Sequence, residues 1–227
     1  MRQSRYERNG TSINEAENST LSEKRVCVLG LGGLGGYIAE TLARVGVLHL
    51  TLIDCDAFDE TNLNRQIFCT ESSIGKRKAA EAEKRLKEVN TDVCVNAIDW
   101  RLNSENAQEL LKGHDIVMDA LDSVETRKTA AKACARLGIP FVHGAIGGWY
   151  GQVAVIMPGS RVLDKLYNGS GDNNIDKSLG NLPFTAAHTA SLQCAEAIKL
   201  LLGKGDALTD SFIRVDLLHN EFDVITL

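Results

Sequence analysis

The chain has 227 residues, of which 44% are hydrophobic and 24% are charged. A chain of this length and composition can bury a substantial core in one domain, which excludes disordered, collagen-like and coiled-coil proteins. Its net charge of −5 provides no overall basic field, so no nucleic-acid partner is expected.

In chain order, residues 1–24 are predicted to form a polar N-terminal arm and residues 25–227 a single domain. Runs rich in β-branched residues then alternate with amphipathic stretches. These patterns predict strands at 25–29, 48–53, 93–98, 115–119, 140–143 and 152–157, and intervening helices at 34–45, 76–89, 104–111 and 124–137. The alternation is typical of an α/β fold with a Rossmann-like, mostly parallel sheet and helices on both faces.

The pattern changes in residues 158–183, which are rich in Gly, Asn, Asp and Ser and too polar to build a core element. A segment of this length predicts a polar crossover loop, which would be a lid, a binding loop or disordered. Beyond it the sequence predicts a helix at 184–202. Residues 212–216 and 222–227 predict a C-terminal antiparallel hairpin.

No segment has about 18 consecutive apolar residues, so no membrane partner is expected. The first 25 residues do not resemble a secretory signal, and a cytoplasmic location is expected. The cysteines form no CxxC pair, so in a reducing compartment we expect free thiols at Cys27, Cys55, Cys69, Cys94, Cys134 and Cys194.

A glycine-rich loop follows the first predicted strand and opens the first predicted helix. Its sequence, GLGGLG at residues 30–35, matches GxGxxG in the context where that pattern indicates nucleotide binding. Glycines at Gly30, Gly32 and Gly35 permit a tight turn and bring a phosphate close to the helix N-terminus. Asp54, after the second strand, is placed to accept hydrogen bonds from ribose hydroxyls. The loop predicts an adenosine-containing ligand, unless it serves only strand-to-helix packing.

An amide and two cations follow Asp54 along the chain, at Asn62, Arg65 and Lys78. The glycine loop and the helix N-terminus can largely offset the charge of a dinucleotide pyrophosphate. A triphosphate carries more charge and requires further cations. These residues therefore argue against a nicotinamide dehydrogenase, although either cation could be a solvated surface charge. Asp122 follows a strand at the carboxyl edge of the sheet, where magnesium would link it to phosphates; its alternative role is helix capping.

Together, several segments resemble the ubiquitin-activating-type adenylyltransferases of the HesA/MoeB/ThiF group. They are GLGGLGG at 30–36, LIDCD at 52–56, NLNRQIF at 62–68, DALDS at 119–123 and GAIGGWYGQVAV at 144–155. The resemblance covers residues 5–202, and this ordered combination is far more specific than the glycine motif alone. It implies that ATP, with magnesium, adenylates the C-terminal glycine of a small ubiquitin-like sulfur-carrier protein ending in Gly-Gly, releasing pyrophosphate.

The resemblance also implies residue roles by position. The nucleotide would be held by Gly30, Gly32, Gly33, Gly35, Asp54, Asp56, Asn62, Arg65, Gln66 and Lys78, and Asp122 would bind magnesium or position the reacting groups. The start Arg5-Tyr6-Glu7-Arg8 resembles an RYxRQ opening whose second arginine reaches ATP in the neighbouring subunit. We therefore expect a homodimer, with a catalytic set of Arg65, Lys78, Asp122 and Arg8.

Adenylation of a carboxylate needs no catalytic base, because a peptide C-terminus has a pKa of about 3.5 and is already ionised at neutral pH. None of the histidines is therefore expected to be required; they are His49, His114, His143, His188 and His219. The obstacle is repulsion between the carboxylate and the triphosphate. Arg65, Lys78, Arg8 and magnesium would relieve it by neutralising charge and fixing an in-line geometry.

The chain departs from many relatives, which carry two CxxC pairs for zinc and sometimes a cysteine on the crossover loop. Neither is present here, so we expect no zinc and no thioester or persulfide on that loop. Cys194 lies among apolar residues of a predicted helix, which favours a core position. The expected product is a carrier acyl-adenylate that is released to a separate sulfur donor.

Two alternatives stay open. The segment DALDS differs from the commoner family text DCTDN and resembles relatives that dehydrate threonylcarbamoyl-adenosine in transfer RNA by the same adenylation chemistry. The acidic net charge and the GGWYGQV segment argue against this first alternative. The second is a non-catalytic scaffold that binds the carrier and uses ATP only structurally.

Overall fold

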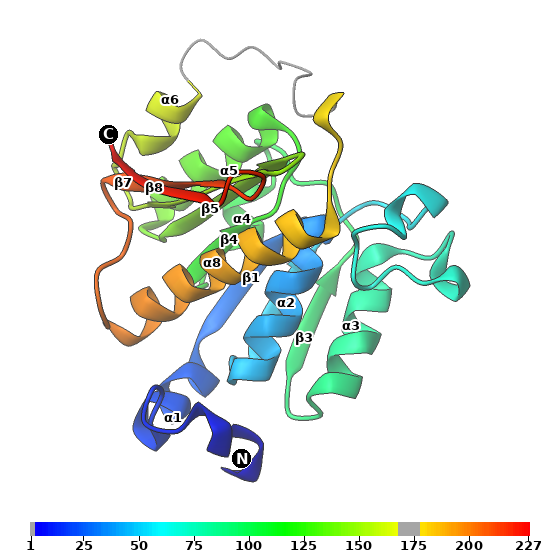
Figure 1. Ribbon diagram of the computed structural model, residues 1–227. Helices are drawn as coiled ribbons and strands as arrows, with labels where there is room; N and C mark the ends of the chain where they lie inside the picture. The colour runs from blue at the N-terminus through cyan, green and yellow to red at the C-terminus, as the bar shows by residue number, and fades with distance from the viewer. Residues whose placement is uncertain (1–2, 168–177) are drawn as a thin grey trace.

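The computed structural model describes residues 3–167 and 178–227. Within them, eight strands form one sheet in the order β3-β2-β1-β4-β5-β6-β7-β8 (Figure 1). The strands are β1 Arg25–Leu29, β2 His49–Ile53, β3 Cys94–Ile98, β4 Ile116–Asp119, β5 Phe141–Gly147, β6 Tyr150–Ile156, β7 Ser211–Asp216 and β8 Glu221–Thr226. The predicted mixed α/β fold is confirmed.

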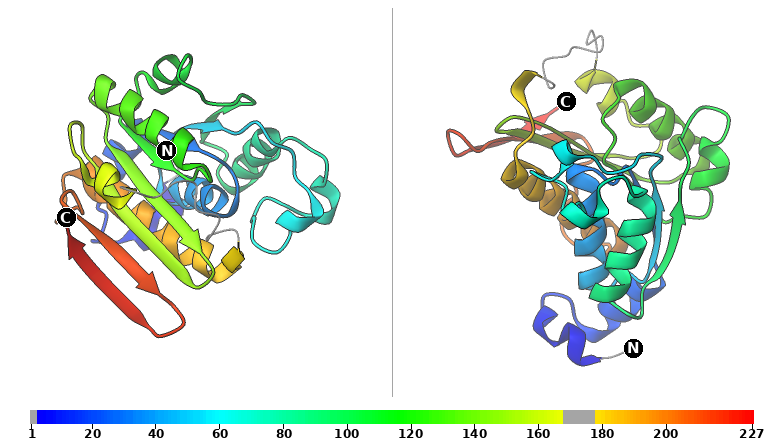
Figure 2. Two further views of the ribbon diagram at one scale, coloured as in Figure 1. Left: turned by 90° about the horizontal axis from the view of Figure 1, so that it is seen from above. Right: turned by 90° about the vertical axis from the view of Figure 1, so that its right-hand side faces the viewer.

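The helices lie on both sides of this sheet (Figure 2). They are α1 Glu15–Glu23, α2 Gly33–Val45, α3 Lys78–Val89, α4 Ala107–Leu111, α5 Val124–Leu137, α6 Val162–Leu166 and α8 Pro183–Leu202, with 3₁₀ helices η1 Gln3–Asn9, η2 Glu60–Asn62 and η3 Glu71–Ser73. The helix α2 ends at Val45 and is capped by Gly46, whose φ of 114° lies in the left-handed region that favours glycine. Pro183 begins α8, at a position where its missing N–H costs no helical hydrogen bond.

The five strands β1 to β5 are parallel where they pair, and this brings several loops to one edge of the sheet. The last residue of β1, Leu29, pairs with Ile53 of β2 and with Asp119 of β4. The loops that follow these three strands therefore start side by side, at the edge where open α/β sheets bind ligands. The strands β5 to β8 are antiparallel, and β7 and β8 form the predicted terminal hairpin.

Each face of the sheet contributes to its own apolar layer. Along β1, Val26 and Val28 belong to the layer under α2, α3 and α8, whereas Cys27 and Leu29 belong to the layer under α4, α5 and α6. The buried strands are apolar on both faces because helices cover both sides of a parallel sheet. This double cover holds the strand ends, and the loops that follow them, in fixed positions.

The N-terminal arm packs against the far ends of two helices. Tyr6 is buried against Gly46, which follows α2, and Asn90 at the end of α3 donates a hydrogen bond from Nδ2 to the Tyr6 hydroxyl at 3.0 Å. Leu21 of α1 is fully buried in the core. Residues 3–24 thus contribute to the packing of the α/β body, and the division at residue 24 stays a prediction.

The expectation that residues 158–183 build no core element is wrong for one part of that segment. Residues 162–166 form α6, in which Val162 and Leu163 are both 5% exposed. The cause is local: two adjacent apolar residues pack into the layer formed with α5, although the surrounding composition is polar. The rest of the predicted crossover loop includes residues 168–177, which lie outside the described residues.

Among the residues that the structure describes, no helix has the length and apolar composition that crossing a membrane requires.

Candidate nucleotide site

The glycine loop between β1 and α2 is shaped by very close backbone contacts. Gly30 has a φ of 85°, and a Cβ there would lie 2.6 Å from the carbonyl oxygen of Ala120. A Cβ at Gly35 would lie 1.8 Å from the carbonyl oxygen of Gly30. Both positions therefore require glycine for packing alone. At Gly32 and Gly33 the nearest atoms would be 3.5 and 3.6 Å away, an ordinary contact distance, so packing does not require glycine there, and both residues are partly exposed.

Asp54 ties this loop to the end of β2. Its Oδ2 accepts a hydrogen bond from the Leu31 N–H at 2.6 Å, and its Oδ1 accepts one from the Asp56 N–H at 2.8 Å. Burial raises the pKa of the Asp54 carboxyl, although these two N–H donors oppose the rise. The carboxylate thus fixes the glycine loop to the end of β2.

Two predicted phosphate-contacting residues lie directly beside the loop. The Cγ of Arg65 would be 3.7 Å from a Cβ at Gly33, and the Nε2 of Gln66 would be 3.5 Å from a Cβ at Gly32. Arg65 donates from Nη1 to the carbonyl oxygen of Thr61 at 2.8 Å. Gln66 is buried, and its Oε1 has no hydrogen-bond partner among the described residues. An unpartnered buried amide oxygen beside an open glycine loop fits a site that a ligand completes.

Lys78 is the first residue of α3 and is 7% exposed. Its Nζ lies 3.5 Å from Asp56 Oδ2, and its N–H donates to the Asp56 carbonyl oxygen at 3.0 Å. The ammonium group is thus held at the same sheet edge as Asp54. Asn62 is also buried, but its side-chain amide bonds to Asp59, the N-cap of η2, and completes a capping box with it, so its observed contacts are structural.

Asp122 lies in the turn between β4 and α5 and is exposed. The cap of α5 is Ser123, whose Oγ accepts a hydrogen bond from the Thr126 N–H at 3.4 Å. Helix capping therefore does not explain Asp122, whose carboxylate makes no hydrogen bond or ion pair within the described part of the chain. Because Ala120 of the same turn lies against Gly30, this carboxylate belongs to the edge that holds the glycine loop.

Arg8 is not part of this arrangement. It lies in η1, where the neighbouring Asn9 donates from Nδ2 to the Val45 carbonyl oxygen at the end of α2. The glycine loop is at the other end of α2, a helix of 13 residues and hence about 20 Å long. Within one chain, Arg8 is therefore remote from Arg65 and Lys78.

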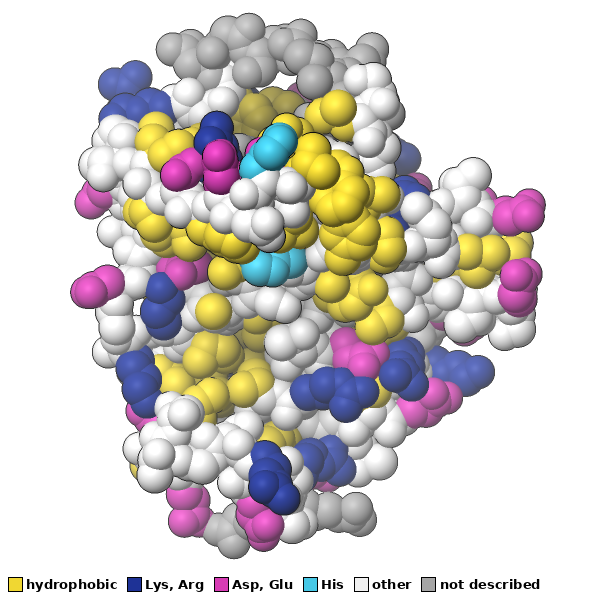
Figure 3. All heavy atoms as spheres, viewed as in Figure 1, with side chains coloured by type: hydrophobic (Ala, Val, Ile, Leu, Met, Phe, Trp, Pro, Cys, Tyr) yellow, Lys and Arg dark blue, Asp and Glu magenta, His cyan; other side chains and the backbone are white. Residues whose placement is uncertain are grey.

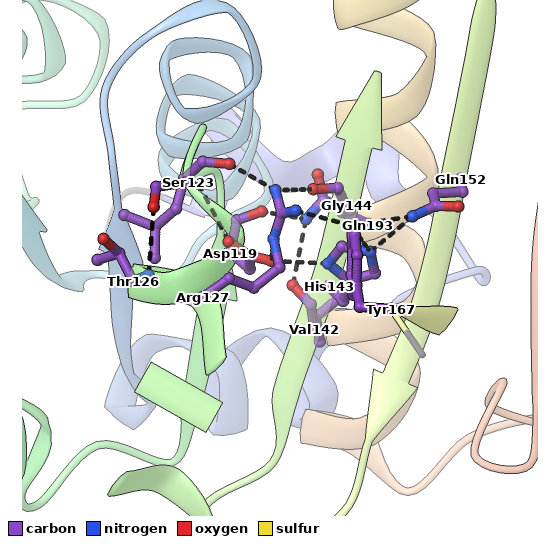
Figure 4. A network of polar contacts seen from close by, with 11 residues as sticks. Asp119, Ser123, Thr126, Arg127, Val142, His143, Gly144, Gln152, Tyr167 and Gln193 are labelled. Atoms are coloured by element: carbon purple, nitrogen blue, oxygen red, sulfur yellow. Dashed lines mark hydrogen bonds and ion pairs between the residues drawn. The ribbon is translucent and has the colours of Figure 1, made fainter. Parts of the chain in front are cut away.

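A buried polar network lies beneath the Asp122 turn, and sequence reasoning missed it (Figure 4). Asp119, fully buried at the end of β4, accepts a hydrogen bond at Oδ2 from Arg127 Nε at 2.7 Å. The same Oδ2 lies 2.7 Å from His143 Nδ1. Tyr167 and Gln152 complete the group around His143 Nε2. No local pattern marks these residues, because they come from β4, α5, β5, β6 and the end of α6.

The charges in this network are set by burial and by pairing. Burial favours the protonated acid, but Arg127 and His143 outweigh it and hold the pKa of Asp119 below its ordinary value. Burial lowers the pKa of His143, and Arg127 adds to that effect while Asp119 partly opposes it. At neutral pH the network therefore contains an ionised Asp119, a cationic Arg127 and a neutral His143.

The cysteines near the core are poor nucleophiles. Burial raises the pKa of Cys194 to about 12, and its Sγ lies 3.8 Å from the Ile38 carbonyl oxygen, in keeping with the predicted core position.

Within residues 3–167 and 178–227, no group of three or more His, Cys, Asp or Glu side chains is arranged to hold a metal ion.

The chain as a whole matches a known family. The model of the ThiF family matches residues 6–227. The chain belongs to the ThiF family. The sulfur carrier protein adenylyltransferase of Thermus thermophilus is 36% identical over 216 residues, which cover 91% of this chain and 80% of that protein. The tRNA threonylcarbamoyladenosine dehydratase of Haemophilus influenzae is 40% identical over 133 residues, which cover 58% of this chain and 50% of that protein.

The fold of this ThiF family member is shared with a solved structure. The crystal structure of E. coli MccB with ATP matches with a TM-score of 0.84 and 22% identity, covering 98% of this chain and 71% of that one. These findings confirm the predicted family and the predicted enzyme class, the adenylyltransferases.

Proposed function

We propose that the protein is an ATP-dependent adenylyltransferase that activates the C-terminal glycine carboxylate of a small ubiquitin-like sulfur-carrier protein. The observation that carries the proposal is that Arg65 and Gln66 lie against the partly exposed glycine loop, while Lys78 is held against Asp56 at the same edge of the sheet. Asp54 stands at the ribose end of this group, and Asp122 carries an exposed carboxylate at the same edge. Similarity to a sulfur carrier protein adenylyltransferase supports the choice of acceptor.

The proposed reaction requires charge neutralisation and alignment. One oxygen of the carrier's carboxylate forms a bond to the α-phosphorus of ATP, while the bond from that phosphorus to the bridging oxygen of pyrophosphate breaks and the electron pair leaves with pyrophosphate. Arg65 and Lys78 offset the negative charge that is brought together, and the N–H groups at the start of α2 hold phosphate oxygens. No residue has to remove a proton from the carboxylate.

A single exposed carboxylate at Asp122 fits a magnesium ion, because Mg²⁺ is usually held by one or two carboxylates together with substrate phosphates. When bound, the ion would neutralise phosphate charge. Asp122 would hold it at the edge of the sheet, in the turn that lies against the glycine loop.

An aromatic surface adjoins the proposed site and is suited to the folded part of the carrier. It consists of Trp149, Phe184 and Phe222, which are 39%, 44% and 55% exposed. Figure 3 shows hydrophobic side chains gathered over the start of α8 and the neighbouring hairpin. Ala186, two residues after Phe184, would be 3.6 Å from a Cβ at Gly33. A carrier resting on this surface would thus have its C-terminus beside the glycine loop.

The partner copy also enters the proposal. Arg8 is exposed and remote from its own chain's glycine loop. We propose that it completes the nucleotide site of a second copy in a homodimer, by adding a third cation to the triphosphate.

The proposed function is tested by ATP–pyrophosphate exchange in the presence of candidate carriers ending in Gly-Gly. Exchange that depends on the carrier, and that disappears when its final glycine is removed, is the expected result. Exchange that requires transfer RNA instead would support the dehydratase-like alternative, which the partial similarity to the Haemophilus influenzae enzyme favours. No exchange with either partner would support the non-catalytic scaffold.

A further inference from the structure

The turn between β4 and α5 presents Asp122, and its backbone is held by two buried charged residues. The Leu121 N–H donates to Asp119 Oδ1 at 3.1 Å, and the Leu121 carbonyl oxygen accepts from Arg127 Nη2 at 2.5 Å. Asp119 and Arg127 are 0% and 5% exposed. Arg127 therefore restrains the turn through the Leu121 carbonyl oxygen, and Asp119 restrains it through the Leu121 N–H.

Arg127 is in turn held by a tyrosine from a distant part of the chain. Its Nη1 donates to the Tyr167 hydroxyl at 2.7 Å, and its guanidinium carbon lies 5.4 Å from the centre of the Tyr167 ring. A cation over an aromatic face is an attractive contact, so the phenol restrains Arg127 both through its hydroxyl and through its ring. Tyr167 directly follows α6.

The Tyr167 hydroxyl also faces His143, which closes the network (Figure 4). The hydroxyl lies 3.3 Å from His143 Nε2, and Gln152 Nε2 lies 3.1 Å from the same nitrogen. A neutral His143 that donates from Nδ1 to Asp119 has Nε2 free to accept a proton donor. The tyrosine can then accept from Arg127 and donate to His143 at the same time, which phenylalanine cannot do.

We propose that Tyr167, supported by His143, is a positioning residue that holds Arg127 and thereby the turn that presents Asp122. The role of Asp122 rests on the proposed function, whereas the coupling of Tyr167 to the turn does not. Two measurements test the coupling of Tyr167 to the turn and the role of Asp122 separately.

The first readout is structural and uses Tyr167→Phe with Tyr150→Phe as the matched control. Tyr150 is exposed and lies outside the network, so its substitution also removes one phenolic hydroxyl. Amide hydrogen exchange of Leu121 is expected to accelerate at least fivefold in Tyr167→Phe and to stay within twofold of wild type in Tyr150→Phe. Strand amides of β1 serve as the internal reference for folding. Equal exchange of Leu121 in the two variants would overturn the proposal.

The second readout is a double-mutant cycle in carrier-dependent exchange. Tyr167→Phe and Asp122→Glu are each expected to lower kcat about tenfold, with the KM for ATP within twofold, since both misplace one carboxylate by a small distance. Together they are expected to cost less than the product of the single losses. A fully multiplicative loss would contradict the proposal. If the wild type shows no exchange with any carrier, the proposed function fails, and Leu121 exchange still decides the positioning role.

Discussion

His143 and Asp119 share one hydrogen bond, but their ionisation affects stability in different pH ranges. Burial lowers the pKa of His143 in the folded protein, whereas the unfolded chain takes up the proton near its ordinary value of about 6.5. Stability from keeping His143 neutral is therefore present above about pH 6.5 and is lost as the pH falls below it. Asp119, with a lowered pKa, loses its contribution only below about pH 4.

The variant His143→Gln is expected to be less stable than wild type at pH 8 but to lose less stability between pH 7 and pH 5. One titrating group contributes at most about 1.4 kcal/mol per pH unit to this slope. Urea unfolding at several pH values measures it. Burial also lowers the pKa of His114, so both proteins are expected to lose some stability as the pH falls. Identical slopes in the two proteins would show that His143 does not titrate in this range.

Thiol reactivity is expected to follow burial. Cys94 is exposed and Cys55 is half-buried, whereas Cys27, Cys69, Cys134 and Cys194 are buried. A thiol-specific chromogenic reagent at pH 8 is expected to modify Cys94 first and Cys55 more slowly, because burial and then Asp56 raise the pKa of Cys55. The buried thiols should react only when denaturant is added. Rapid reaction of a buried thiol in the native protein would contradict the packing.

Cys194→Ala is expected to retain adenylation and to lose about 1 kcal/mol of stability, which is typical for a small core truncation. Carrier-dependent exchange and denaturant unfolding measure the two effects. A loss of exchange with unchanged stability would instead assign Cys194 a chemical role.

At the scale of elements, substitutions in the glycine loop and at the start of α2 distinguish a glycine needed for packing from a glycine proposed to lie against the ligand. A Cβ at Gly35 would meet backbone at 1.8 Å, so Gly35→Ala is expected to cost about 3 kcal/mol or more of stability. Gly32→Ala, whose nearest atom would be 3.5 Å away on a flexible side chain, is expected to fold with a loss below about 1 kcal/mol. Because the added methyl occupies the space proposed for a phosphate, ATP affinity should fall at least tenfold. Calorimetric titration with ATP measures it, and unchanged affinity would place the phosphates elsewhere.

Regular periodic elements could be predicted, and short isolated ones could not. The helix at 124–137 has the predicted bounds, and the helix predicted at 184–202 begins one residue earlier. Both long helices bury small apolar residues at helical spacing, which leaves a clear pattern in sequence; they are Ala130, Ala133 and Cys134 of α5 and Ala186, Ala190, Cys194 and Ala197 of α8. The five-residue α6 is too short to show periodicity, and its two buried residues acquire meaning only when α5 and β6 supply the other side of the layer.

At the scale of the whole molecule, the position of Arg8 leads to a complementation experiment. If Arg8 completes the site of a second copy, Arg8→Ala and Lys78→Ala should each lose most exchange activity. A mixture of equal amounts, exchanged to equilibrium, should recover about a quarter of wild-type activity, because half of the dimers then hold one intact site out of two. Sedimentation measures the dimer in parallel. An inactive mixture of confirmed dimers would contradict action across the interface.

The sequence by itself determined the order of strands and helices along the chain and the glycine loop, and it predicted that Asn62, Arg65 and Lys78 bind a triphosphate. Those features depend on local periodicity and on steric requirements within a few neighbouring residues. Both can be recognised from the sequence alone. Only the tertiary structure decided that Arg65 and Gln66 flank Gly33 and Gly32, and that Arg8 lies at the far end of α2.

Tertiary structure also decided which histidine pairs with Asp119 in the buried network. No sequence pattern distinguishes His143 from the other histidines, and it joins the buried network only because β5 places it against Asp119 of β4. Arg127 and Tyr167 are 40 residues apart and come from separate helical segments. Burial gives their contacts strength, because a charge removed from water requires partners wherever in the chain they are found.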